Sequence, residues 1–167
     1  MRKAGLLFWL AAGLAAPAAM AGDASGFDPA AISQCLAEAS SQGAQVDCTE
    51  AGMAACLDYA RDRYRGDDPD FPQWNCLDAA HQAWEAELTA TYRRLLEQEA
   101  AAGAGPQDML RRAEHSWIAF RDDLCNWTGE AAAARGENGE LATLRCRRDE
   151  AARHRALLDG RLQDGGG

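Results

Sequence analysis

Cysteine is the residue type with which this sequence could do the most definite chemistry. Six cysteines follow residue 21: Cys35, Cys48, Cys56, Cys76, Cys125 and Cys146. In a chain that leaves the cytoplasm such an even set predicts disulfides, each worth about 3 kcal/mol of stability for loops of this length. A zinc site is the alternative use, but the sequence has neither CxxC nor HxxxH spacing. We therefore expect no metal and no other cofactor.

The positions of the cysteines rank the possible pairings without deciding among them. Six cysteines allow 15 pairings, and all of them remain open at this point. Cys35 and Cys56 lie nearly symmetrically about the turn expected near residue 45, and Cys125 and Cys146 do so about the turn near residue 135, which favours these two pairs. Cys48 and Cys76 then remain as the third favoured pair. The main competing arrangement joins Cys76 to Cys125, which would link the third and fourth expected helices.

Histidines near carboxylates are the next candidates for chemistry, as acid–base groups. His81 lies four residues before Glu85 on an expected helix, and His115 follows Glu114 directly. Polar helix faces account for both histidines more simply. The chain also contains no GxSxG, no glycine-rich phosphate loop and no HExxH. We therefore expect a protein that is not an enzyme, and an enzyme of unknown chemistry is the most distant of three hypotheses.

A short acidic and aromatic segment, residues 66–74, is the candidate for partner binding. Two prolines and three aspartates argue against regular structure there, so we interpret it as a linker. Its spacing does not fit a twelve-residue calcium loop, and a plain solvated linker is the simplest alternative. The candidate binding residues are Asp67, Asp68, Asp70 and Trp74, with Glu137 and Asn138 of a later connection as second choice.

The beginning of the chain has the pattern of a cleavable export signal. Arg2 and Lys3 precede an apolar run, and Ala19-Met20-Ala21 has the small residues of a cleavage site. Removing residues 1–21 takes the formal net charge from −9 to −11, because that segment carries two basic residues and no acid. We expect a periplasmic or secreted protein with no membrane insertion after cleavage. Its acidity disfavours nucleic acid and favours basic partners.

Composition predicts an all-α fold. One valine and two isoleucines cannot supply the β-branched residues that sheets use, while alanine, leucine, glutamate and arginine abound. We expect a disulfide-linked antiparallel helical bundle, in which an N-terminal helical hairpin precedes a three-helix core. The predicted segments are a signal peptide at 1–21, the hairpin at 22–65 with helices over 28–40 and 49–65, the linker at 66–74, the core at 75–162 with helices from 75, 106 and about 140, and a disordered tail at 163–167.

Periodicity pairs the third and fourth helices. A small-residue turn near residue 103 makes them an antiparallel hairpin, in which facing positions sum to about 205. This register sets Leu88 against Trp117 and Glu85 against Arg121, the second as a half-buried ion pair. Apolar residues recur along both helices with helical spacing, so we expect the aromatic stripe to be core: Trp84, Trp117, Phe120 and Trp127.

The same two helices carry a resemblance to a known family. The segments Trp84-Glu85-Ala86-Glu87-Leu88, Tyr92-Arg93-Arg94-Leu95 and Trp117-Ile118-Ala119-Phe120-Arg121-Asp122, with Cys76 and Cys125, resemble the LprI-type lysozyme-inhibitor domain over about residues 75–160. The resemblance implies a secreted, cysteine-containing helical module that inhibits lysozyme. The residues that match its signature are Trp84, Glu85, Leu88, Tyr92, Trp117, Phe120 and Arg121.

The leading hypothesis is therefore an acidic exported protein that blocks a basic, peptidoglycan-cleaving lysozyme. Electrostatic steering would speed the encounter, and a rigid loop would then occlude the enzyme's cleft. The alternative is an envelope interaction or structural module whose acidic surface only keeps it soluble. A pull-down from envelope extract separates the two hypotheses, because a stable partner other than lysozyme favours the second.

Overall fold

The computed structural model describes residues 25–165, so the predicted signal peptide lies outside the described residues. Over this range the elements are helices only, which confirms the predicted fold class: α1 Ala30–Glu38, α2 Gln42–Asp47, the 3-10 turn η1 Cys48–Glu50, α3 Met53–Arg63, α4 Phe71–Ala102, α5 Ala104–Ala134 and α6 Gly139–Asp164. None of these helices is both long and apolar enough to cross a membrane.

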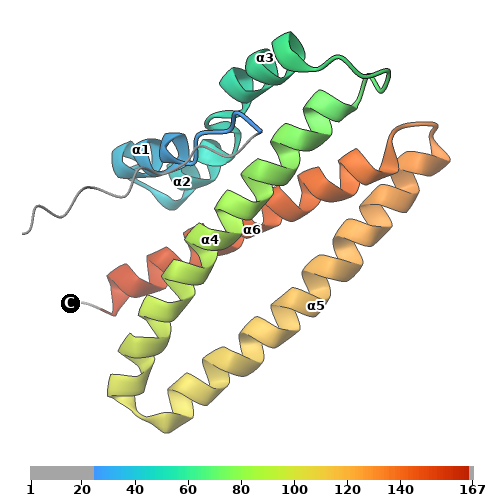
Figure 1. Cartoon of the computed structure of the whole chain (residues 1–167). Coiled ribbons are helices and arrows are strands. Elements are labelled where there is room, and N and C mark those ends of the chain that lie inside the picture. Colours follow the sequence, from blue (N-terminus) through green and yellow to red (C-terminus); the bar gives the residue numbers. More distant parts are fainter. Residues whose placement is uncertain (1–24, 166–167) are drawn as a thin grey trace, which may run out of the picture.

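Three long helices form the body of the molecule. α4 and α5 meet at Gly103, whose φ of +129° ends one helix and starts the next. From this turn the two helices diverge, and α6 runs back between them, packing along both (Figure 1). The predicted antiparallel hairpin with a turn near residue 103 is therefore confirmed, and α4 makes its most extensive contacts with α6.

The N-terminal region is not the simple hairpin that we predicted. Ser41 caps a short additional helix, α2, by accepting a hydrogen bond from the backbone N–H of Ala44 at 3.1 Å. The chain then passes through η1 and turns at Gly52, whose φ of +82° favours glycine, into α3. The segment expected to connect the two predicted helices, residues 41–48, is therefore largely helical.

The extra helix explains why two of the three favoured disulfides were wrong. The structure contains Cys35–Cys48, Cys56–Cys76 and Cys125–Cys146, so only the last of the favoured pairs is confirmed. α2 and η1 bring Cys48 back onto α1, which leaves Cys56 of α3 opposite Cys76 of α4. The competing Cys76–Cys125 bridge is absent too. The N-terminal region is thus attached to the core through Cys56–Cys76.

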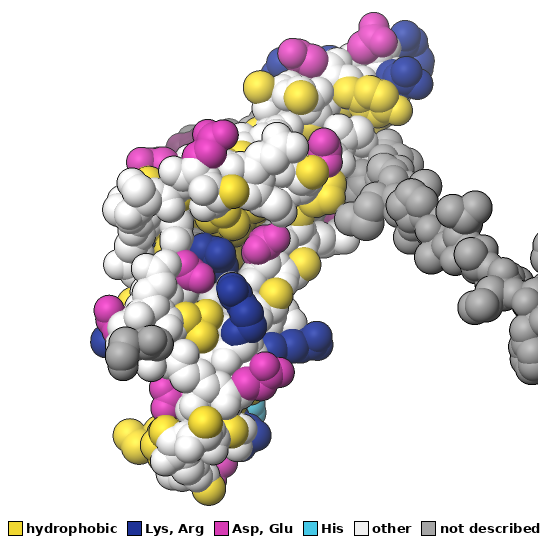
Figure 2. Space-filling model, turned by 90° about the vertical axis from the view of Figure 1, so that its left-hand side faces the viewer, with side chains coloured by type: hydrophobic (Ala, Val, Ile, Leu, Met, Phe, Trp, Pro, Cys, Tyr) yellow, Lys and Arg dark blue, Asp and Glu magenta, His cyan; other side chains and the backbone are white. Residues whose placement is uncertain are grey.

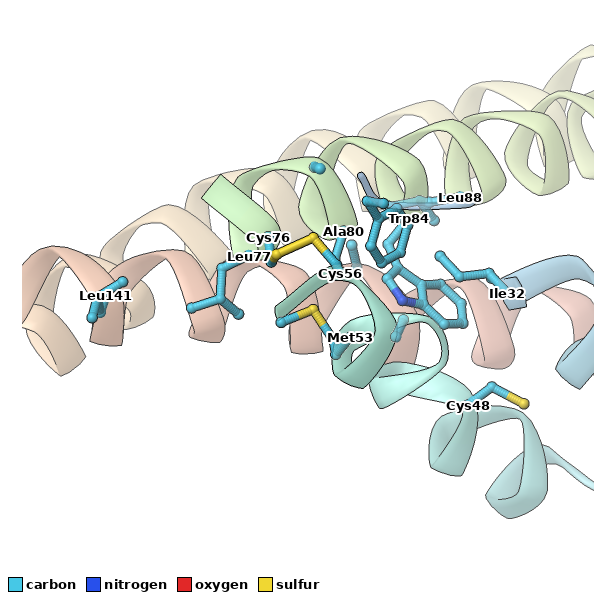
Figure 3. Close-up of a cluster of buried hydrophobic side chains, with 14 of the residues drawn as sticks. Ile32, Cys48, Met53, Cys56, Cys76, Leu77, Ala80, Trp84, Leu88 and Leu141 are labelled. Atoms are coloured by element: carbon cyan, nitrogen blue, oxygen red, sulfur yellow. A yellow bond between two sulfur atoms is a disulfide. The ribbon is translucent and has the colours of Figure 1, made fainter. Parts of the chain in front are cut away.

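The main core lies where the N-terminal helices cover α4. Trp84 is fully buried and lies close to Ile32 of α1, while Met53 of α3 and the Cys56–Cys76 disulfide pack nearby (Figure 3). These side chains come from three helices and leave almost no surface exposed. Burial of this apolar surface is what fixes the N-terminal helices on α4.

Buried arginines interrupt the apolar pattern of α6. The guanidinium of Arg148, which is 1 % exposed, donates to Glu50 of η1 and to its neighbour Asp149. Arg155 donates to Oε1 of Gln45 in α2 at 2.8 Å. The arginines that interrupt the apolar pattern therefore hold α6 against the N-terminal region by charge-assisted hydrogen bonds.

Three further predictions are corrected by the long helices. Phe120 and Trp127 are 56 % and 65 % exposed, so they are surface residues of α5 and only Trp84 and the half-buried Trp117 serve the core. The segment to Trp74 is not irregular throughout, because α4 begins at Phe71 with a proline in its first turn. At the other end α6 continues to Asp164, into the predicted disordered tail.

Candidate functional site

Two connections lie together at one end of the molecule, which we call the tip and define as residues 64–74 and 135–138. They follow α3 and α5 and lie near each other in space (Figure 1). The side-chain Nδ2 of Asn138 donates a hydrogen bond to Oδ2 of Asp70 at 2.7 Å. The first and second choices for a partner-binding segment are therefore parts of one surface.

The first connection of the tip is held in one conformation by its own side chains. The ring of Tyr64, which directly follows α3, stacks on Phe71 with centroids 4.6 Å apart. The backbone N–H of Asp68 donates to the Tyr64 hydroxyl at 3.1 Å, and that of Asp70 donates to the Asp68 carboxylate at 2.9 Å. Short contacts of this kind, together with two prolines, leave the segment little conformational freedom.

The carboxylates of the tip are available to a partner. Within the described residues, none of Asp67, Asp68 and Asp70 forms an ion pair, and the first two are exposed. Glu137 differs, because Arg135 bonds to it at 2.7 Å and so holds the pKa of Glu137 below its usual range. The tip therefore offers three hydrogen-bond acceptors to an arginine or lysine.

Aromatic side chains lie beside these carboxylates. Trp74 in the first turn of α4 is 42 % exposed, and Phe71 is exposed to a similar extent. In Figure 2, hydrophobic, acidic and arginine side chains gather at the top of the molecule, where α3 lies. Aromatic residues with a polar surround are typical of binding surfaces. The roles of Tyr64 and Phe71 were missed because the sequence does not show that they stack.

A second feature, a cleft of about 210 Å³, lies between α4 and α5. Five of the seven signature residues line it, so they gather in one place. The full lining is Glu85, Leu88, Thr89, Tyr92, Glu114, Trp117, Ile118 and Arg121. Arg121 donates from Nη1 to Oε1 of Glu85 at 2.9 Å, which confirms the predicted ion pair.

The charges of the cleft are already satisfied within the chain. A hydrogen bond with His81 and the nearby Arg121 hold the pKa of Glu85 below its ordinary value, although burial opposes them. His154 of α6 bonds to Glu114 at 2.8 Å and stacks on Trp117 with centroids 3.9 Å apart. We interpret the cleft as part of the packing contact between the three helices, because it presents no free charge to a ligand.

The three histidines have different surroundings. His81 is half-buried and pairs with Glu85, whereas His115 is exposed. The partner of Glu114 is His154, forty residues away, which only the packing of α6 on α5 brings close. Among residues 25–165, no group of three or more His, Cys, Asp or Glu side chains is placed to hold a metal ion.

The comparison with known families decides what kind of protein this is. A family model described as lysozyme inhibitor LprI matches residues 72–157, which is 86 of 167 residues. The chain belongs to the LprI lysozyme-inhibitor family. No curated protein and no solved structure matches it.

The LprI match covers only the C-terminal part of the described residues. It begins at Pro72 in the first turn of α4 and ends at Leu157 in α6, so it covers the three long helices and the Cys125–Cys146 bridge. The N-terminal helices precede it. The tip combines both parts, because Trp74 and Asn138 lie inside the LprI region whereas Asp70 lies outside it.

Proposed function

We propose that this LprI-family protein binds a peptidoglycan-cleaving lysozyme outside the inner membrane and covers the enzyme's substrate cleft with the tip. Membership of a family of lysozyme inhibitors is the starting point. Three disulfides suit a protein of an oxidising compartment, which is where lysozymes meet the cell wall.

The observation that carries the proposal is the construction of the tip. Its two connections are joined by the Asn138–Asp70 hydrogen bond, and its three aspartates are free of ion pairs within the described residues. A rigid binding surface loses little conformational entropy when it docks, so more of the contact energy appears as affinity. The exposed ring of Trp74 adds an apolar anchor of the kind that dominates binding energies.

Charge supports the same partner. The sequence has a formal net charge of −9, and a basic enzyme would be attracted over distances longer than direct contact. Such steering raises the association rate and weakens as salt screens it. Occlusion of the cleft needs no catalytic group on the inhibitor, which agrees with the internal pairing of the Glu85 and Glu114 charges.

The test compares three forms of the protein in a cell-wall lysis assay with lysozymes of several classes. A tip variant carries Asp67→Asn, Asp68→Asn and Asp70→Asn, which keep the acceptor oxygens for the local hydrogen bonds but remove the charge. A matched control carries Glu38→Gln, Glu97→Gln and Asp123→Asn, three exposed carboxylates outside the tip.

We expect the wild-type protein to slow lysis at stoichiometric concentration and low salt. The tip variant should associate with the lysozyme roughly tenfold more slowly, because it loses local charge at the contact, whereas the control should lose much less. Equal losses in the two variants would show that net charge acts without the tip. No slowing by the wild type with any lysozyme class would reject the function.

A further inference from the structure

The outer face of α5 carries a row of exposed apolar side chains that residues 25–165 do not cover. We call this row the α5 seam: Met109, Ala113, Phe120 and Trp127. Its three large members are 64 %, 56 % and 65 % exposed. Phe120 lies nine residues from the buried Gly129, about two and a half helical turns, so the two positions point in opposite directions.

The spacing of the α5 seam is that of a contact between helices. Ala113, Phe120 and Trp127 repeat every seven residues, the period with which one helix packs along another. Within the molecule, α5 packs on α6 through its other face, which includes Cys125 and Gly129. Exposed Ser116 and Asp123 lie between these positions on the same face. A row of large exposed apolar side chains along one helix face still marks a surface for another molecule.

The charges that flank the seam indicate which molecule covers it. Arg112 and Glu130 are 18 residues apart, about five full turns, so both lie along the same edge of the seam. Neither side chain forms an ion pair within residues 25–165. In an antiparallel pair of α5 helices centred near residue 121, Arg112 of each copy meets Glu130 of the other.

We propose that the α5 seam binds a second copy of this chain, with the two α5 helices antiparallel. This arrangement sets Phe120 near its own equivalent and the small Ala113 opposite the large Trp127, which suits close packing. A parallel arrangement would hold Arg112 of one copy and Glu130 of the other at opposite ends of the contact, so neither charge would meet its opposite. Antiparallel pairing also puts the two tips at opposite ends, where both remain free.

The size of the seam predicts a reversible dimer. Aromatic side chains cover about 150–250 Å² each, and a little over half of each seam side chain is exposed, so the seam offers on the order of 400 Å² per copy. Stable complexes bury about 800 Å² per partner. We therefore expect a weak dimer, with a dissociation constant in the micromolar range.

Charge reversal tests this pairing on the mature chain from Gly22, by sedimentation equilibrium over a concentration series. Arg112→Glu alone, or Glu130→Arg alone, should weaken the dimer about tenfold, because each creates like-charged pairs across the seam. The double variant should restore the wild-type affinity. Residues 18 apart on a helix are about 27 Å apart, so this rescue cannot arise within one chain.

Two more variants complete the design. Phe120→Ser should weaken the dimer strongly, whereas Leu157→Ser, at an exposed apolar position on α6, should not. Helical circular dichroism and the melting temperature of the monomer confirm that each variant folds. A wild-type protein that stays monomeric to about 1 mM would overturn the proposal. Single reversals without effect, or a double variant without rescue, would overturn it equally.

Discussion

Asn138 joins the two connections of the tip while it also caps α6. Its Nδ2 donates to Oδ2 of Asp70 at 2.7 Å, and its Oδ1 accepts from the backbone N–H of Leu141 at 3.1 Å. One side chain therefore sets both the start of α6 and the position of a connection 68 residues earlier. The position of the two connections relative to each other therefore depends on this residue.

Two substitutions of Asn138 separate its roles. Asn138→Ala removes both hydrogen bonds, and loss of the cap should lower the free energy of unfolding by about 1 kcal/mol. Asn138→Asp keeps a capping oxygen but places a carboxylate against Asp70, so the cap should survive while the two connections separate. Thermal unfolding measures the first effect, and faster amide hydrogen exchange in residues 64–70 reports the second. Unchanged exchange in the aspartate variant would contradict the account of the tip.

The Glu85–Arg121 pair should contribute measurably to stability. Arg121 is 13 % exposed, and Arg121→Met leaves Glu85 half-buried without its guanidinium partner. We expect a loss of about 1–2 kcal/mol, less than for a fully buried pair, because Glu85 is 35 % exposed and water screens it. Arg111→Met breaks the exposed pair with Asp108 and should cost less than about 0.5 kcal/mol. Denaturant unfolding of the two variants provides the comparison. Equal losses of unfolding free energy would show that the Glu85–Arg121 pair stabilises the protein no more than an exposed pair does.

The lowered pKa of Glu85 predicts a contribution to acid sensitivity. The His81 hydrogen bond and Arg121 favour the charged carboxylate, so its pKa in the folded protein lies below the ordinary 4.5. Such a group adds stability that is complete above the unfolded pKa and is lost as the pH falls through the folded one. Glu85→Gln should therefore lose less stability than the wild type on acidification below about pH 4.5. The difference is under about 1 kcal/mol because solvent screens the group. Parallel acid titrations of unfolding free energy for the two proteins would reveal it.

Gly129 and Gly160 should respond oppositely to alanine. A Cβ at Gly129 would lie 2.8 Å from the carbonyl oxygen of Gly139, so α5 and α6 approach too closely for a side chain. Gly129→Ala should therefore destabilise the protein by about 1–3 kcal/mol. Gly160 has nothing within 4 Å, and Gly160→Ala should stabilise α6 by about 0.5–1 kcal/mol. A melting temperature that rises for both variants would show that helix propensity, not close packing, governs position 129.

Local patterns in the sequence predicted the long helices well. The Glu85–Arg121 pair followed from the turn near residue 103, because a short connection fixes the register of both helices. Pro72 was harder to interpret, since proline ends some helices and begins others. Here it lies in the first turn of α4, and Trp74 consequently belongs to that helix.

The features that the sequence did not predict depend on contacts between distant segments. The pairing of Cys35 with Cys48 requires α2 and η1, which are too short to leave a periodic signal. Periodicity placed Phe120 and Trp127 on one face of a helix, but it does not show whether that face is covered. The Asn138–Asp70 bond brings together two connections whose sequences give no sign of each other.

Competition with a ligand of the lysozyme cleft would show whether the tip covers that cleft. A lysozyme that this protein inhibits is titrated with it in the presence and absence of a short chitin oligomer that fills the cleft. If the tip covers the cleft, the oligomer should raise the apparent dissociation constant by the factor 1 + c/Kd, where c is the oligomer concentration and Kd is the oligomer's own dissociation constant. A complex in which both ligands bind the enzyme at once, with unchanged affinity, would contradict the account.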